Sequence, residues 1–333
     1  LGVHRRFLPP ARGFDVFYGF VNTGIDYYTH ERYGVPSMYR NNSPTTADKG
    51  TYCTDLFERE AVRFLKTKRR EPFFLYVPFN APHGASNLDP TIRGGAQAPD
   101  RFKAMYPGLL AQVGTERRTR YGKTYTVPNR AARRLEFVGS VTAMDAAIGR
   151  LLDLLDEYGI ADNTIVLFFS DNGGGSSADN APLRGRKGQM FEGGLRVPCI
   201  VRWPGKIPAG TTSDAFLTSL EVVPTLCAAT GAAPPKGVAL DGFDMLPVLQ
   251  SKKRSPRTEM FWQRKLDKGA RVGHWKWVES SRGSGLFDLR EDIGERRDLS
   301  GEQPEILKRV QARFANWKKQ MQAAEPRGPF RDF

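Results

Sequence analysis

Cysteine and histidine are scarce in this 333-residue chain, which contains only three cysteines and four histidines. Cys53, Cys199 and Cys227 show no CxxC spacing, so the sequence indicates neither a disulfide framework nor a thiolate zinc site. We expect each cysteine to be a small buried apolar residue. Long apolar runs are also missing: FFLYVPF (73–79) and TIVLFF (164–169) fall far short of the ~20 residues of a membrane helix. We therefore expect no membrane partner.

Acidic residues are too few to balance the basic ones. Fifty lysines and arginines stand against 36 aspartates and glutamates, a net charge of +14. This excess favours polyanionic partners, although each basic run, KTKRR (66–70), ERRTR (116–120) and SKKRSPR (251–257), is by itself most simply a solvated surface. The sequence lacks zinc-finger, RNP and helix-turn-helix signatures, so we expect no nucleic-acid partner. It gives no indication of the oligomeric state.

Strand-like and helix-like segments alternate along most of the chain. Asp55 and Glu58 resemble a capping box that begins a helix, and the run 73–79 reads as an interior strand after it. A second helix is expected from about Ala132 to Gly159, followed by the strand at 164–170. This alternation predicts an α/β fold with a mainly parallel central sheet flanked by helices.

The pattern of predicted helices and strands changes after Pro247. Short strand-like segments precede a helix in which Ile306, Val310, Phe314 and Trp317 form one stripe. Trp275 and Trp277 occupy alternate strand positions and therefore share one face, which favours a core role over stacking on a sugar. We predict an α/β domain over residues 1–250 and a small C-terminal α+β subdomain over residues 251–333.

Candidate site residues follow two of the expected strands. Asp171 and Asn172 come directly after the strand at 164–170, where carboxylate and amide oxygens are suitable ligands for Ca²⁺ or Mg²⁺. An ordinary Asp-Asn-Gly turn is the alternative interpretation. Lys187, between glycines in GRKG (185–188), can place an ammonium on a tetrahedral oxyanion. His83 follows the run 73–79, and its imidazole can donate a proton to a leaving alcohol.

In these segments the chain resembles the sulfatase family of the alkaline-phosphatase superfamily. The resemblance extends over RGFDVFYGF (12–20), the residues from Tyr76 to His83, FFSDNGG (168–174), PLRGRKGQMFEGGLRVP (182–198) and GLFDLREDIGERRDL (285–299). It implies that Asp171 and Asn172 bind a divalent cation, usually Ca²⁺, that Lys187 and His83 contact the sulfate, and that His83 protonates the leaving group. Arg184 either lines the pocket or braces its loop, and Glu192 is expected to pair with Arg196 or to cap loop backbone.

The family nucleophile has no counterpart among these residues. It is a formylglycine, made by a formylglycine-generating enzyme from the Cys or Ser of a C/S-x-P-x-R motif, and no cysteine or serine here lies in such a motif. The early Asp pair of the family is missing too, and Leu1-Gly2 matches the end of a GKWHLG motif. We therefore expect an N-terminally truncated sulfatase, inactive as this polypeptide, that binds calcium weakly and exposes an apolar sheet edge.

For the whole enzyme, the resemblance implies hydrolysis of an organic sulfate ester, and the basic charge favours a sulfated polysaccharide over a small aryl sulfate. Loops such as the one from Gly84 to Val127 would select the substrate. One alternative is a phosphodiesterase or phosphonate monoester hydrolase of the same superfamily, and another is a non-catalytic module that binds sulfated glycans. Sulfatases of glycans are commonly periplasmic, secreted or lysosomal, but the sequence shows no address signal.

Overall fold

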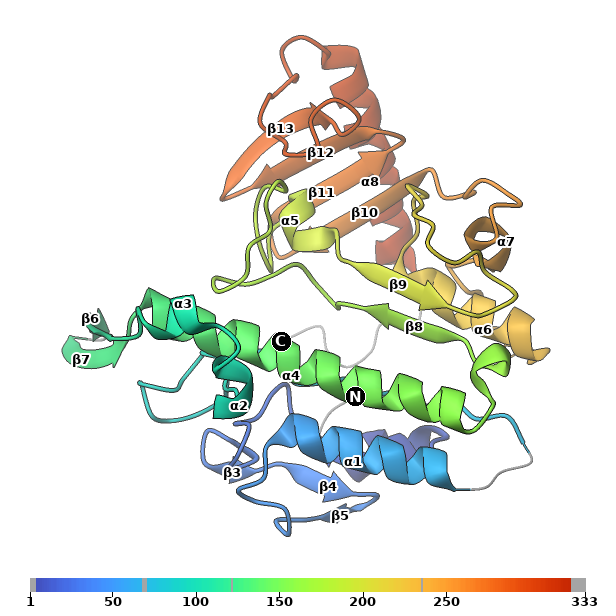
Figure 1. Cartoon of the computed structure of the whole chain (residues 1–333). Coiled ribbons are helices and arrows are strands. Elements are labelled where there is room, and N and C mark those ends of the chain that lie inside the picture. The colour runs from blue at the N-terminus through green and yellow to red at the C-terminus, as the bar shows by residue number, and fades with distance from the viewer. Residues whose placement is uncertain (1–3, 68–70, 121, 235, 325–333) are drawn as a thin grey trace. The chain divides into compact units, whose positions relative to one another are not determined.

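The computed structural model describes residues 4–67, 71–120, 122–234 and 236–324 (Figure 1). The chain forms two compact units, Leu1–Ala161 and Asp162–Phe333. The boundary expected at residue 250 lies inside the second unit and stays a prediction. In the described residues, no helix combines the length and apolar character needed to cross a bilayer.

Two helices dominate the first unit, α1 (Cys53–Lys66) and α4 (Arg130–Glu157), which lie side by side (Figure 1). The short helices are η1 (Arg5–Phe7), η2 (Pro9–Arg12), α2 (Asp100–Lys103) and α3 (Pro107–Leu110). The strands are β1 (Tyr18–Phe20), β2 (Glu31–Arg32), β3 (Val35–Pro36), β4 (Met38–Arg40), β5 (Ser43–Pro44), β6 (Thr115–Arg120) and β7 (Lys123–Pro128). They form an antiparallel sheet in the order β1-β4-β5 and the two pairs β2-β3 and β6-β7.

The long helix α4 confirms the periodicity of its sequence. Asn129 caps it, because its Oδ1 accepts a hydrogen bond from the Ala132 amide at 2.8 Å. The buried line along the helix includes the small residues Gly139, Ala143 and Ala147. Small side chains are needed there, since a Cβ at Gly139 would lie only 2.9 Å from the Cβ of Ala98. Close packing of neighbouring segments thus selects this face.

The start of α1 differs from the expectation. The helix begins at Cys53, so Asp55 lies inside the first turn and no side chain caps the N-terminus. Asp55 instead accepts hydrogen bonds from Arg101 at 2.8 and 2.9 Å. The capping-box prediction was wrong because a distant arginine provides a charge-assisted partner for this carboxylate.

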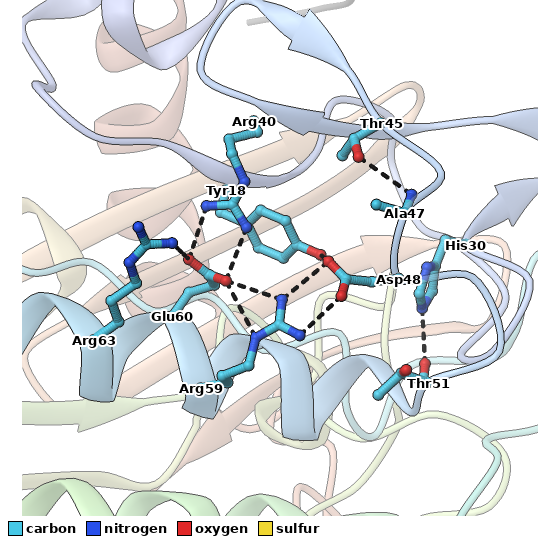
Figure 2. Close-up of polar contacts among 10 residues, drawn as sticks. All are labelled: Tyr18, His30, Arg40, Thr45, Ala47, Asp48, Thr51, Arg59, Glu60 and Arg63. Carbon is cyan, nitrogen blue, oxygen red and sulfur yellow. Dashed lines mark hydrogen bonds and ion pairs between the residues drawn. The ribbon is translucent and has the colours of Figure 1, made fainter.

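An ionic cluster joins β1, β4 and α1 (Figure 2). Arg59 forms a bidentate pair with Asp48 at 2.8 and 2.9 Å, and Arg40 forms another with Glu60, both bonds 2.9 Å long. Tyr18 donates its hydroxyl hydrogen bond to Asp48 at 2.5 Å. Hydrogen bonds from Arg59, with a smaller contribution from Tyr18, lower the pKa of Asp48 to about 2 although burial opposes them. The cluster therefore fixes α1 to the small sheet through fully charged partners.

The run 73–79 does not form the interior strand that we expected. It is extended but pairs with no strand in the described part of the chain, and its side chains alternate in exposure. Phe74 is 59% and Tyr76 65% exposed. A strand is defined by its hydrogen-bonded neighbour, and here one face of the segment is open. Because the segment belongs to no sheet among the described residues, the expected apolar sheet edge stays a prediction.

The second unit begins with η3 (Ala161–Asn163), which spans the boundary, and with β8 (Val166–Phe169), which pairs with β9 (Cys199–Arg202). Its other helices are α5 (Glu192–Leu195), η4 (Ser219–Glu221), α6 (Val222–Thr230), α7 (Leu246–Leu249) and α8 (Pro304–Ala323). The pair β8-β9 is antiparallel, as are all other pairs among the described strands. A parallel pair needs a long crossover, usually a helix, whereas α5 between β8 and β9 has four residues. The expected strand at 164–170 is thus confirmed, but its ladder partner runs in the opposite direction.

Four strands in sequence order form an antiparallel sheet at the C-terminal end: β10 (Glu259–Arg264), β11 (Asp267–Val272), β12 (Trp275–Ser280) and β13 (Gly283–Asp288). Helix α8 covers one face of this sheet (Figure 1). Trp277 is buried among Phe261, Val310 and Phe314, and Trp275 packs against the same cluster. The expected strands, the apolar stripe of α8 and the core role of both tryptophans are confirmed.

Two expectations about polar surface and cysteines need correction. Cys53 is buried, but Cys199 is exposed on β9 and Cys227 is half-buried. In the basic run 251–257, Arg257 is not a solvated charge, because it pairs with the fully buried Glu221. Lys68, Arg69 and Arg70 of the run 66–70 lie outside the described residues. The residue after Cys199 in β9, Ile200, is also exposed, so both side chains at this end of the strand face solvent.

Candidate functional site in the second unit

Strand β8 ends beside the expected metal ligands. The hydroxyl of Ser170 donates to the carbonyl oxygen of Asn172 at 2.9 Å, which turns the chain sharply after the strand. Asp171 is exposed and Asn172 is half-buried. The carboxylate of Asp171 has no hydrogen-bond or ion-pair partner within the described ranges. It is therefore free to coordinate a ligand.

Backbone hydrogen bonds join the segment 170–175 to the segment 183–194, and we call these two segments the ligand loops. The Lys187 amide donates to the Gly174 carbonyl at 3.0 Å, and the Gly173 amide donates to the Gly194 carbonyl at 3.1 Å. Asn180 connects both loops, because its Nδ2 donates to the carbonyls of Gly174 and Gly185, each at 3.1 Å. The structure thus brings the loop that carries Asp171 and Asn172 against the loop that carries Lys187.

The contact between the ligand loops is too close for side chains. Between the loops, a Cβ at Gly173 would lie 1.9 Å from the Gly193 carbonyl oxygen; within the second loop, a Cβ at Gly194 would lie 2.2 Å from the Gln189 carbonyl oxygen. Glycine is required here for close approach of two backbones. Gly173 and Gly194 therefore have a structural reason that the sequence alone did not give.

Lys187 presents its ammonium at the surface of the second ligand loop. Its side chain is exposed and has no ion-pair partner in the described part of the chain. Its backbone is held by the bond to Gly174. An unpaired ammonium on a fixed backbone is suited to an oxyanion, since no internal carboxylate competes for its charge.

Arg184 braces the second ligand loop. One guanidinium nitrogen donates to the Glu295 carbonyl at 2.9 Å, and the guanidinium carbon lies 4.0 Å from the centroid of the Phe191 ring. Of the two roles that the sequence left open for Arg184, these contacts favour bracing. Direct contact with substrate stays a prediction.

A buried ionic cluster anchors the same loop to the C-terminal sheet. Lys276 of β12 is fully buried, and its Nζ lies 2.7 Å from Glu192 Oε1 and 3.8 Å from Glu295 Oε1. The Glu192 amide donates to Glu295 Oε2 at 2.6 Å. Arg196, the partner expected for Glu192, lies at 3.9 Å and is a secondary contact.

The two carboxylates of this cluster differ in proton affinity. Burial raises the pKa of Glu295 to about 7, and the Lys276 ammonium offsets only part of that effect. Burial acts most strongly on the pKa of Glu192 and acts upward, but the charge and hydrogen bond of Lys276, together with the charges of Arg271 and Arg196, outweigh it and the pKa is lowered. The surrounding cations therefore favour the ionised form of Glu192, whereas the pKa of Glu295 is raised to about 7. Sequence reasoning missed Lys276 and Glu295; the signal was the alternation in WKWVES (275–280), which places Lys276 opposite both tryptophans.

His83 belongs to the first unit and is described there alone. Its Nδ1 lies 2.9 Å from the Gly84 carbonyl oxygen, and a carbonyl only accepts, so Nδ1 carries the hydrogen. Its own carbonyl accepts from the buried Tyr27 hydroxyl at 2.8 Å. The ring is exposed, and its Nε2 has no hydrogen-bond partner among the residues described. Nε2 is thus the atom available for proton exchange.

The donor set near β8 fits a hard divalent cation in type. The described residues contain no group of three or more His, Cys, Asp or Glu side chains that could hold a metal. Asp171 and Asn172 supply a free carboxylate and an amide oxygen, which suit Ca²⁺ but fall short of its six to eight ligands.

Comparison with known proteins identifies the family. The family model described as sulfatase matches residues 4–232. The chain belongs to the sulfatase family. A second model, for the C-terminal part of N-sulphoglucosamine sulphohydrolase, matches residues 186–323, and so covers Lys187, the buried ionic cluster and the C-terminal sheet.

Similar curated proteins include arylsulfatase J of Mus musculus, 26% identical over 96% of this chain and 58% of its own length. The sulfatase YdeN of Escherichia coli is 32% identical over 76% of this chain and 40% of its own. The N-acetylgalactosamine-6-sulfatase of Homo sapiens is 29% identical over 84% of this chain and 51% of its own. This sulfatase chain spans about half the length of these relatives.

Solved structures share the fold of this chain. Ps i-CgsB, crystallised in complex with k-i-k-neocarrahexaose, matches with a TM-score of 0.77 and 28% identity, over 95% of this chain and 69% of that one. A protein in complex with its substrate D-glucosamine-2-N,6-O-disulfate matches with a TM-score of 0.69 and 18% identity, over 95% of this chain and 78% of that one. These likenesses confirm the predicted α/β, alkaline-phosphatase-like fold class.

Proposed function

We propose that the protein carrying this chain hydrolyses an organic sulfate ester to an alcohol and sulfate, and that its substrate is a sulfated carbohydrate. The observation that carries the proposal is the hydrogen-bonded pair of ligand loops, which presents the free Asp171 carboxylate and the free Lys187 ammonium on one backbone unit. Membership of the sulfatase family supports the reaction class. Relatives named for N-acetylgalactosamine-6-sulfate and a neighbour bound to neocarrahexaose support the carbohydrate class.

Each proposed role follows from the side chain's surroundings. The Lys187 ammonium contacts sulfate oxygens, where its uncompensated charge stabilises the negative charge that develops in the transition state. His83, starting as the imidazolium, donates its Nε2 proton to the departing alkoxide and becomes the neutral ring whose Nδ1–H is bonded to the Gly84 carbonyl. Arg184 positions the loop through Glu295 and Phe191.

Asp171 and Asn172 would hold a divalent cation, for which we propose Ca²⁺. When bound, the cation supplies positive charge that attracts sulfate oxygens. The 333 residues contain no C/S-x-P-x-R motif, so we assign no nucleophile to this chain. A formylglycine and its generating enzyme are proposals for the whole protein, as is a periplasmic, secreted or lysosomal setting.

The test compares Lys187→Ala with Lys206→Ala in the full gene product. Lys206 is also an exposed lysine of the second unit, and serves as the control for loss of one positive charge. On 4-nitrophenyl sulfate we expect Lys187→Ala to lower kcat/KM by about 100-fold or more, the size typical of removing one oxyanion contact, and Lys206→Ala to leave it unchanged.

Matched substrates separate the rival functions. Faster turnover of bis(4-nitrophenyl) phosphate or a phenylphosphonate monoester than of the sulfate would replace the proposal with a phosphodiesterase or phosphonate hydrolase. Tight binding of a sulfated oligosaccharide without turnover of any ester would replace it with a binding module.

A further inference from the structure

A concavity of about 340 Å³ lies directly beside the ligand loops. Its lining includes Ser176, Asp179, Asn180, Arg186 and Arg296. It begins at Gly175, one residue after the carbonyl that accepts the Lys187 amide. Its volume lies at the small end of the range for ligand sites, about 300–1,000 Å³. There is room for one sugar ring or one anionic substituent with its linkage.

The wall of the concavity is held in place by hydrogen bonds. Asn180 Oδ1 accepts from the Gly174 amide at 3.1 Å, and its Nδ2 donates to Gly185. On the opposite side, the Arg296 amide donates to Asp292 at 2.6 Å, which fixes the turn after Glu295. A Cβ at Gly294 would lie 3.1 Å from the Pro182 carbonyl oxygen, so this turn packs against the Asn180 side. Both rims therefore have a defined backbone.

The charge of the concavity is net positive. Arg186 and Arg296 are exposed, and neither side chain forms an ion pair within the described ranges. Asp179 is the opposing carboxylate in the lining, and one of its oxygens accepts from the Ala181 amide at 3.0 Å. Two guanidinium groups with one partly engaged carboxylate favour an anionic ligand, because guanidinium forks match the oxygens of sulfate. The hydroxyl of Ser176 and the second carboxylate oxygen of Asp179 provide partners for sugar hydroxyls.

We propose that this concavity, which we call the Arg186–Arg296 pocket, binds a second sulfate group of a multiply sulfated saccharide while the ester to be cleaved contacts Lys187. The inference rests on the proposed function and specifies its substrate: a saccharide with two or more sulfates. Arg186 and Arg296 are specificity residues here, since they contact the substrate away from the reacting ester.

The experiment measures binding of two chondroitin disaccharides, one monosulfated and one disulfated, to the full gene product by calorimetry. Both probes carry the same uronate, so the difference between them isolates the second sulfate. We expect R186Q/R296Q to weaken binding of the disulfated probe by about 10- to 30-fold and of the monosulfated probe by less than about threefold, as charge-assisted bonds of moderate strength predict.

The matched control is R254Q/R309Q, which removes the same charge from two exposed arginines of the second unit that do not line the pocket. It should change neither affinity by more than about threefold. Equal losses on both probes, or equal losses in both double variants, would show general electrostatic attraction and overturn the proposal. Unchanged binding of the disulfated probe by R186Q/R296Q would overturn it as well.

Hydrolysis of 4-nitrophenyl sulfate separates this proposal from the proposed function. That ester has no second anion, so R186Q/R296Q should lower its kcat/KM by far less than Lys187→Ala does. Absence of turnover in the unsubstituted protein would refute the proposed function, whereas the affinity difference between the two disaccharides would still report on the pocket.

Discussion

Replacing Lys276 by methionine should destabilise the second unit strongly. Lys276 and Glu295 are fully buried and Glu192 is nearly so, and the lysine is the shared cation of both carboxylates. Methionine preserves most of the volume but leaves the buried carboxyl groups of Glu192 and Glu295 without their shared ammonium. Breaking a buried pair in this way costs about 3–5 kcal/mol.

The loss should depend on pH in a defined direction. In the unsubstituted chain the pKa of Glu295 is raised from 4.5 to about 7, so the folded chain binds more protons than the unfolded chain in that window. The stability from this group is therefore fully present below pH 4.5 and lost as pH rises to about 7. Glu192, whose pKa is lowered, contributes stability above pH 4.5 that is lost on further acidification. Without Lys276 both carboxyls favour protonation, so the variant should lose more stability at pH 8 than at pH 5.

Urea unfolding followed by tryptophan emission measures this loss, because all five tryptophans lie between Trp203 and Trp317, in the second unit. The control is Lys268→Met, which removes the part-exposed partner of Glu279 on the adjacent strand β11 and should cost at most about 1 kcal/mol. The triple variant K276M/E192Q/E295Q should regain most of the lost stability, since it removes the unpaired charges. A loss below about 1 kcal/mol for K276M, a loss independent of pH, or no recovery in the triple variant would refute the reasoning.

Three further predictions address other parts of the molecule. Gly173→Ala should destabilise the second unit by about 3 kcal/mol, measured by urea unfolding with tryptophan emission, because its Cβ would meet the Gly193 carbonyl. The control Gly175→Ala has open space around the new Cβ and should change stability by less than about 0.5 kcal/mol. Equal effects of the two substitutions would contradict the close contact of the ligand loops. Arg59→Met should raise the pKa of Asp48 from about 2 toward 3.8 in a carboxyl NMR titration. The lowered pKa stabilises the fold above pH 3.8 and does so less as the pH falls, so the difference in stability between the variant and the unsubstituted chain should shrink in acid. The control Arg63→Met, which removes a contact at 4.0 Å to Glu60, should leave the pKa of Asp48 unchanged. This 333-residue chain should bind Ca²⁺ with a Kd on the order of 1 mM in calorimetry. Asp171→Asn should weaken Ca²⁺ binding by about tenfold, and the control Asp162→Asn should leave the affinity unchanged. A micromolar Kd would contradict the inference that the set of ligands is incomplete.

Local periodicity carried most of what the sequence could predict. The helices α4 and α8 follow from apolar residues at helical spacing, and the core position of Trp277 follows from strand alternation. These signals are local, so they do not depend on which segment packs against them. The positions of Asp171 and Lys187 on turns after β8 were predictable for the same reason, because glycines and a strand end mark them in the sequence.

Pairing partners distant in sequence were the features that the sequence could not supply. Nothing in 73–79 says which strand would accept its hydrogen bonds, and nothing in β8 says that β9 would pair with it antiparallel. The buried cluster has the same origin, since Lys276 lies 84 residues from Glu192 and reads as an ordinary strand lysine. Burial of a charge depends on the whole arrangement of neighbours, and it leaves little mark on the local pattern.

The hydrogen bonds between the ligand loops also have a thermodynamic consequence. Because the amide of Lys187 is bonded to Gly174, a cation held at Asp171 and Asn172 and an anion held at Lys187 act on the same backbone unit. Whatever factor the cation adds to the affinity for the anion, the anion must add to the affinity for the cation. Inorganic sulfate and Ca²⁺ titrated together would therefore report a single coupling free energy, the same whichever ligand is added first.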